Sequence, residues 1–162
     1  MSRRGTGGLE AFRYAAAGMM EAFRSQRNVR IHVVAGTLAM ELGVLYGLGT
    51  TAWMALVTVA TLVLAMEMVN TALEAAVDLA HPDWHPLAKA AKDVVAGAVL
   101  VAALGALAVG CIIFGPRLDR LPLLLVTTAA RQPVKFAGLL AGLAVAVAAA
   151  MLGGRREPPG AR

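Results

Sequence analysis

Residues 66–78 of the chain read MEMVNTALEAAVD, an apolar stretch interrupted by three carboxylates and one amide. These polar residues are Glu67, Asn70, Glu74 and Asp78. Because they are spaced three, four and four residues apart, a helix would present them within an arc of about 80°. Carboxylates are costly next to lipid, so we expect this polar stripe to face a polar cavity.

The composition indicates a membrane protein of one compact domain. The chain has 162 residues, of which 59% are hydrophobic and 15% are charged, whereas about a quarter of a soluble domain is charged. The apolar residues form long runs. The net charge of +5 comes from basic residues near the ends of these runs, with no interleaved basic and aromatic stripe. We therefore expect no nucleic-acid partner.

The pattern of apolar residues predicts an all-α membrane protein. Residues 9–27 form an amphipathic helix that lies on the membrane surface. Three core transmembrane helices cover residues 31–49, 51–80 and 91–114, and the second is too long to lie wholly in hydrocarbon. A fourth, alanine-rich apolar helix covers residues 136–152.

The predicted organisation has four parts. Residues 1–8 form a disordered N-terminus, and residues 9–116 form the membrane core. Residues 117–154 form a C-terminal extension that contains the extra helix, and residues 155–162 form a disordered tail. The polar stripe lies in the core, so we expect the chemistry there.

Basic residues predict how the chain is oriented. Those between Arg3 and Arg30 place the N-terminus in the cytoplasm. Lys89 and Lys92 place the connection between the second and third spanning helices in the cytoplasm as well. The segment after the third helix then lies outside, although it carries Arg117, Arg120, Arg131 and Lys135. That segment fits the positive-inside rule badly, and the topology of the fourth helix stays open.

The depth of the polar stripe favours chemistry at the membrane surface. If the second helix enters hydrocarbon near Ala52, Glu67 lies about 22 Å further along, in a layer about 30 Å thick. Glu67 then sits just inside the cytoplasmic boundary, and Glu74 and Asp78 lie at or beyond it. A lipid head group and a water-borne substrate can meet at this level.

The loop after the stripe adds polar residues that suit phosphate binding. Lys92 and Asp93 are expected to open the third helix at its positive N-terminal end. A lysine there, facing clustered carboxylates, can bind phosphates together with a divalent cation. The alternative is a network of salt bridges that only joins the second and third helices.

Two other classes of function remain possible from the spacing alone. A small carrier or ion-coupled transporter could use Glu67 and Glu74, but it would place its carboxylate near the midplane of the membrane. A purely structural bundle would not need the stripe. The sequence contains no P-loop, no dinucleotide-binding glycine motif, no zinc spacing and no nucleophile elbow.

The same residues resemble the bacterial diacylglycerol kinase and undecaprenol kinase family. The resemblance rests on the stripe, on His85-Pro86-Leu-Ala-Lys89-Ala-Ala-Lys92-Asp93, and on Phe12-Arg13-Tyr14-Ala15 and Arg27-Asn28-Val29-Arg30-Ile31-His32 upstream. It covers about residues 9–116. It implies a three-helix membrane fold with a surface helix, assembled as a homotrimer with active sites between neighbouring subunits in the bacterial inner membrane.

The resemblance also implies a reaction and a role for each residue. The reaction is Mg²⁺-dependent phosphorylation of a lipid hydroxyl by ATP, as used in lipid recycling, with Glu67 as the general base. Glu74 corresponds to a metal-binding glutamate, while Asn70 and Asp78 are supporting polar residues. The expected nucleotide contacts are Tyr14, Gln26, Asp83, Trp84, His85, Lys92 and Asp93.

One position departs from the family pattern. Gln26 stands where the family usually has a second metal-binding glutamate, so it would bind Mg²⁺ without charge and more weakly. Glu21 could compensate. The lipid is undecaprenol or diacylglycerol, and the variants at residues 28–32 and 85–89 look more like the undecaprenol branch. Glu41, within the first spanning helix, matches no motif, and could be protonated or paired inside the bundle.

Overall fold

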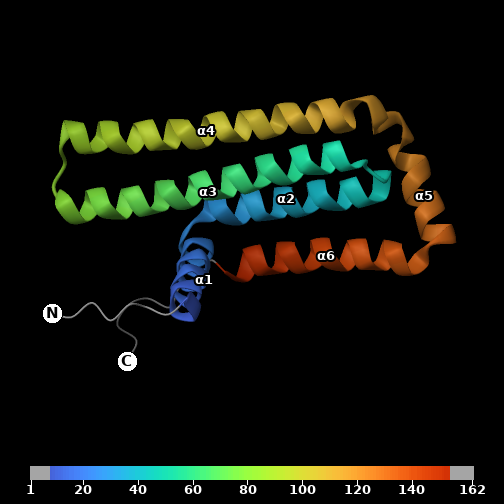
Figure 1. Ribbon diagram of the computed structural model, residues 1–162, viewed down its shortest axis with the longest axis horizontal. Coiled ribbons are helices and arrows are strands. Elements are labelled where there is room, and N and C mark those ends of the chain that lie inside the picture. Colours follow the sequence, from blue (N-terminus) through green and yellow to red (C-terminus); the bar gives the residue numbers. More distant parts are fainter. Residues whose placement is uncertain (1–7, 154–162) are drawn as a thin grey trace.

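The computed structural model describes residues 8–153, which fold into helices with no strand among them (Figure 1). In chain order the elements are α1 (Gly8–Ser25), α2 (Arg27–Tyr46), α3 (Thr50–Ala80), α4 (Pro86–Phe114), the 3₁₀ helix η1 (Gly115–Arg120), α5 (Leu121–Arg131) and α6 (Pro133–Leu152). Our predictions of disorder at the two ends fall on residues outside this range, except that Gly8 begins α1.

The all-α membrane fold is confirmed. Between residues 8 and 153, four helical stretches are long and apolar enough to cross a membrane: α2, α3, the stretch that begins with α4, and α6. The first three are the core helices expected from the sequence, and the last is the expected C-terminal helix. The protein is therefore a multi-pass membrane protein.

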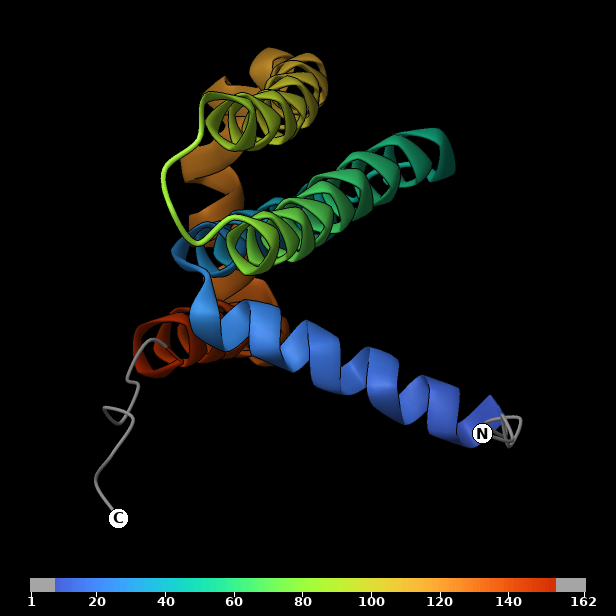
Figure 2. The ribbon, with the colours of Figure 1, turned by 90° about the vertical axis from the view of Figure 1, so that its left-hand side faces the viewer.

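The long helices lie side by side, and α5 closes one end of them. Figure 1 shows α4, α3, α2 and α6 running along the long axis, with α5 crossing from the end of α4 to the start of α6. Contacts join α3 to α4, α2 to α3, and α6 to α2. Helix α1 projects sideways from the start of α2 (Figure 2), whereas α3 and α4 extend further and their connecting loop forms the end opposite α5 (Figure 1). The end of α6 returns to α1, where Gly153 approaches the ring of Phe23.

Two joints hold the bundle in shape. Where α1 meets α2, Arg30 donates hydrogen bonds to the carbonyl oxygens of Phe23 and Arg24 at 3.3 and 3.0 Å, which satisfies free acceptors at the end of α1. At the far end, the Tyr46 hydroxyl donates to the carbonyl of Arg117 at 3.0 Å. This bond ties η1 to the end of α2 across 71 residues of sequence.

Several helix boundaries differ from the prediction for identifiable reasons. Helix α2 begins at Arg27 and ends at Tyr46, because Gly47 adopts a left-handed conformation with φ 63° that terminates it. Helix α4 begins at Pro86 and not near Ala91, because Pro86 occupies the first helical turn and the His85 side chain accepts a hydrogen bond from the Leu87 N–H. The expectation that Lys92 opens this helix is therefore wrong.

The C-terminal extension holds more helix than expected. Between α4 and α6 the chain forms η1 and the short helix α5, neither of which the sequence analysis identified. Helix α5 has 11 residues, too few to cross a bilayer. Its place at the end of the bundle brings the start of α6 beside the end of α2 (Figure 1).

Candidate active site

The polar stripe of α3 runs from the buried interior to the exposed end of the bundle. Glu67 is 2% exposed and Asn70 is also buried, whereas Glu74 is half-buried and Asp78 is exposed. Asn70 Nδ2 donates a hydrogen bond to Glu74 Oε1 at 3.0 Å. The stripe thus combines one buried carboxylate with two that are at least partly exposed, and its predicted depth in the membrane stays a prediction.

His32 is the neighbour of the buried carboxylate. Its Nε2 atom lies 3.2 Å from Glu67 Oε1, and this contact links α2 to α3. The two atoms are close enough for a hydrogen bond, but none that is aligned reaches Glu67 Oε1 within residues 8–153. Sequence analysis gave His32 no role. One feature of the sequence could have identified it: His32 is the one ionisable side chain between Arg30 and Glu41, in an otherwise mostly apolar run.

Ion pairs organise the exposed end of α3 and α4. Lys92 Nζ pairs with Asp78 across the two helices, and Lys89 pairs with Asp93 one turn along α4. The first pair is the salt bridge that the structural alternative expected. Lys92 lies in the second turn of α4, with its side chain 34% exposed, so it remains accessible to a phosphate from water.

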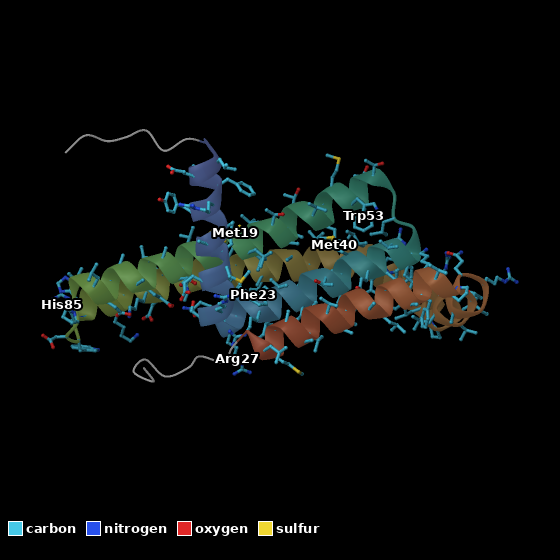
Figure 3. All side chains as sticks on the ribbon, turned by 90° about the horizontal axis from the view of Figure 1, so that it is seen from below. Met19, Phe23, Arg27, Met40, Trp53 and His85 are labelled. Carbon is cyan, nitrogen blue, oxygen red and sulfur yellow. The ribbon has the colours of Figure 1, made fainter. Side chains whose placement is uncertain are left out.

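The loop between α3 and α4 presents its side chains to the surface. Asp83, Trp84 and His85 are all exposed, and the rings of His81 and His85 stack with centroids 5.3 Å apart. Figure 3 shows His85 near one end of the bundle and Trp53 toward the other. The loop therefore lies at the same end as Asp78 and Lys92.

The predicted residues at the N-terminal side form a separate group. Tyr14 is exposed on α1, where the guanidinium group of Arg13 lies 5.6 Å from its ring centroid. Gln26 occupies the position before α2, and its side chain makes no capping bond. Within residues 8–153, no hydrogen bond or ion pair joins either residue to the stripe or to Lys92.

Glu74 suits a magnesium ion that also binds a nucleotide. In residues 8–153 no three His, Cys, Asp or Glu side chains converge on one point. Mg²⁺ sites in kinases use one or two carboxylates and complete their coordination with phosphates and water. Glu74 is half-buried and uses only Oε1 in its hydrogen bond with Asn70, so its other oxygen could take that part.

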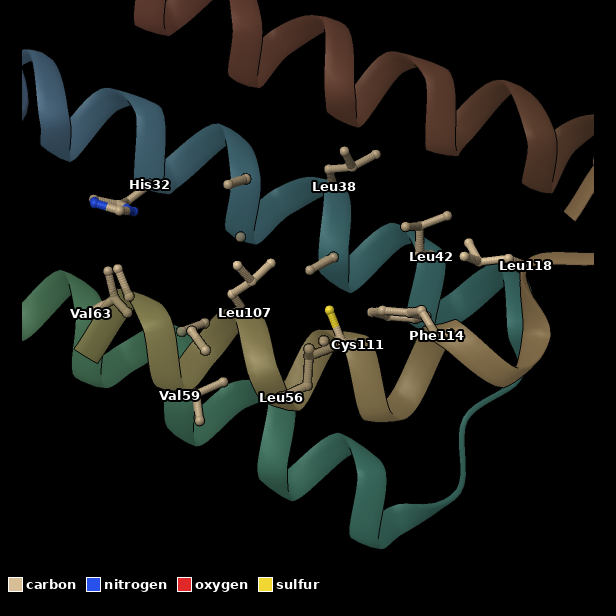
Figure 4. A pocket seen from close by; sticks show the side chains of 18 residues that line it. His32, Leu38, Leu42, Leu56, Val59, Val63, Leu107, Cys111, Phe114 and Leu118 are labelled. Atoms are coloured by element: carbon tan, nitrogen blue, oxygen red, sulfur yellow. The ribbon is translucent and has the colours of Figure 1, made fainter. Parts of the chain in front are cut away.

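An apolar cavity reaches His32, the neighbour of the buried carboxylate. It has a volume of about 520 Å³ and is lined by α2, α3, α4 and η1. His32 lies at one end and Leu118 at the other (Figure 4). Apart from His32 and Cys111, every lining residue is aliphatic, aromatic or glycine. The cavity therefore suits a hydrocarbon chain with a polar group at the His32 end.

Known proteins resemble most of the chain. The model of the prokaryotic diacylglycerol kinase family matches residues 13–114. A diacylglycerol kinase of Synechocystis sp. is 46% identical over 113 residues, which are 68% of this chain and 65% of that protein. The undecaprenol kinase of Bacillus subtilis is 38% identical over 110 residues, covering 68% of this chain and 89% of that protein. A diacylglycerol kinase of Pseudomonas aeruginosa is 33% identical over 94 residues, covering 58% and 76%. No solved structure matches significantly.

The region that matches the family coincides with one part of the fold. It begins within α1 and ends at the last residue of α4, so it contains the stripe, His32 and both α4 lysines. Helices η1, α5 and α6 lie beyond it. The aligned part spans just under two thirds of the Synechocystis relative. Because the family model covers more than half of the sequence, the chain belongs to the prokaryotic diacylglycerol kinase family.

Proposed function

We propose that this membrane protein transfers the γ-phosphoryl group of ATP to the hydroxyl group of a membrane lipid. The relatives are kinases by name, and the family match covers every residue of the stripe. The observation that carries the proposal is the buried carboxylate of Glu67 beside an apolar cavity. A lipid in that cavity can bring its hydroxyl group to a base held out of water.

Glu67 acts as the general base in this proposal. The lipid hydroxyl oxygen attacks the γ-phosphorus in line, and its proton passes to the Glu67 carboxylate while ADP leaves with the electrons of the broken P–O bond. Phosphoryl transfer depends chiefly on positioning and charge neutralisation. Lys92, paired with exposed Asp78, supplies a positive charge at the end of the site. Glu74 and Gln26 would hold Mg²⁺, which shields the phosphate charges when bound.

The remaining nucleotide contacts are proposed from the resemblance. Asp83, Trp84 and His85 lie in the loop near Lys92, where the nucleotide would enter from water. Asp93, which pairs with Lys89, would contact the nucleotide from α4.

A homotrimer with sites between subunits explains why the site residues of one chain form two groups. Tyr14 and Gln26 make no bond to the stripe within the described chain. A neighbouring subunit could bring its own Tyr14 and Gln26 to the stripe. The resemblance implies this arrangement, together with the bacterial inner membrane and a cytoplasmic N-terminus. The proposed core spans residues 9–116, and the extension spans residues 117–154.

The lipid is proposed to be undecaprenol, with diacylglycerol as the alternative, in a recycling role. The family includes relatives with either name. The basis for preferring undecaprenol is the sequence at residues 28–32 and 85–89. The transporter alternative receives no support from the relatives, which are named as kinases.

ATP turnover by the purified protein in mixed micelles tests the function. Each lipid is supplied separately, and the phosphorylated lipid is measured directly. Glu67→Gln should lower the rate by roughly 10²–10⁴, the usual contribution of a general base. Glu41→Gln is the matched control, because Glu41 is a membrane carboxylate outside the stripe. The proposal fails if no lipid alcohol is phosphorylated, or if Glu67→Gln retains the wild-type rate.

A further inference from the structure

We propose that His32 is a positioning residue that fixes the orientation of the Glu67 carboxylate at the end of the apolar cavity. This inference rests on the proposed kinase function, in which Glu67 receives the proton of the lipid hydroxyl. The stripe lies entirely on α3, and the inference adds to it a residue from the neighbouring helix α2.

The first argument is that Glu67 has no other polar partner in the described chain. Its side chain is 3% exposed, so water offers little compensation. The Asn70 amide donates to Glu74, and the Thr71 hydroxyl donates to the backbone carbonyl of Glu67 and not to its carboxylate. Glu74 carries the same charge. Among the described residues, only His32 Nε2, at 3.2 Å, lies within reach of a carboxylate oxygen of Glu67.

The second argument is the place of His32 in the cavity. Its side chain is 25% exposed and lines the end of the cavity, whereas Glu67 does not line it. Figure 4 shows the imidazole at this end, with Val63 on the facing helix and apolar residues beyond it. A hydroxyl group that enters along the cavity therefore meets His32 beside the carboxylate.

The third argument concerns the freedom of the carboxylate. The last torsion of a glutamate side chain is broad and roughly two-fold, so an unpartnered carboxylate samples many orientations. A neutral imidazole with its proton on Nε2, 3.2 Å from Oε1, can donate to that oxygen once a small rotation of the ring aligns the N–H, and it leaves Oε2 to accept the lipid proton. Since misplacement of a reacting group by about 1 Å can cost roughly 10²-fold in rate, this constraint matters. The role requires an N–H donor at the position of Nε2, and it does not require His32 to take up the proton.

Two substitutions separate this role from a merely structural one. His32→Leu removes the donor while retaining bulk, and His32→Gln returns an amide N–H. Lipid kinase assays should give a kcat about 10²-fold lower for His32→Leu with the KM for ATP little changed. His32→Gln should recover most of the lost kcat. Thr37→Val is the matched control on α2, because it removes a polar group whose hydroxyl bonds only to Val33 of its own helix.

A double variant tests the dependence on Glu67. In the Glu67→Gln background, His32→Leu should lower kcat by less than threefold, because residues that act as a unit are not additive. A wild-type kcat for His32→Leu, or a His32→Gln enzyme as slow as His32→Leu, overturns the inference. If His32→Leu does not insert, His32→Ala replaces it, and added imidazole must restore its kcat. An inactive wild type would instead contradict the proposed function.

Discussion

Exchanging the charges of Lys92 and Asp78 should lower the catalytic efficiency for ATP without unfolding the protein. The double variant Lys92→Asp/Asp78→Lys keeps an ion pair between α3 and α4 but moves the positive charge from α4 to α3. In the wild type these side chains are 34% and 65% exposed. Such exposed pairs contribute about 0.2–1 kcal/mol to stability, so the exchange should change the free energy of unfolding by less than about 1 kcal/mol.

The expected effect on activity is larger. A hydrogen bond between charged groups, such as Lys92 and a phosphate, contributes about 1.5–3 kcal/mol. At 1.4 kcal/mol for each factor of ten, its loss lowers kcat/KM for ATP by about 10- to 150-fold. The two magnitudes differ enough for one pair of measurements to separate phosphate binding from a purely structural salt bridge.

Unfolding in mixed micelles and steady-state kinetics with varied ATP supply both numbers. Lys135→Met is the control, since it removes a lysine from α6, outside the proposed site. Wild-type stability together with wild-type kcat/KM for the exchanged variant would show that Lys92 serves only to join the helices. A loss of several kcal/mol in stability would refute the estimate for the ion pair itself.

Three further substitutions test other parts of the molecule. Gln26→Glu should lower the Mg²⁺ concentration for half-maximal activity, because a carboxylate is a charged ligand; an unchanged Mg²⁺ dependence would place Gln26 away from the metal. Gly43→Ala should destabilise the protein by about 1–3 kcal/mol in micelle unfolding, because its Cβ would lie 2.9 Å from the ring of Trp53. Gly36→Ala is its control, because a Cβ atom added at Gly36 would meet no neighbouring atom within 4 Å. Equal stabilities of the Gly43→Ala and Gly36→Ala variants would contradict the packing argument. Deleting residues 133–162 should retain lipid kinase activity but lower the midpoint of thermal unfolding, and an inserted but inactive protein would contradict this.

The sequence predicted the helices well where hydrophobicity alone determines them. Apart from the stripe and four threonines, the run from Thr51 to Ala80 is apolar, and α3 begins one residue earlier and ends where expected. The start of α4 was misplaced because the apolar run, and not the capping signal of His85 and Pro86, was used to find it. Helix α5 was missed because 11 residues with a proline in the first turn resemble a connecting segment.

Contacts between helices were beyond the reach of the sequence pattern. Helical spacing shows that Glu67 and Asn70 share a face of α3, but it does not identify which residue of another helix lies opposite. The contact of His32 with Glu67 depends on how far α2 slides along α3, and packing at the Gly43–Trp53 contact contributes to that register. The pairing of Lys92 with Asp78 likewise follows from the length of the loop between α3 and α4.

Helix α6 offers a physical reason for a carboxylate that has no part in the proposed reaction. Glu41 lies on α2 against Gly142 of α6, where a Cβ atom would approach Glu41 Oε1 to 2.5 Å. Glycine leaves room for this carboxylate between the two helices, as small residues do where membrane helices pack closely. Without α6, the same group would face lipid, which is costly. The extension therefore shields an otherwise exposed polar group of the core, and its loss should affect the stability of α2 before it affects phosphoryl transfer at Glu67.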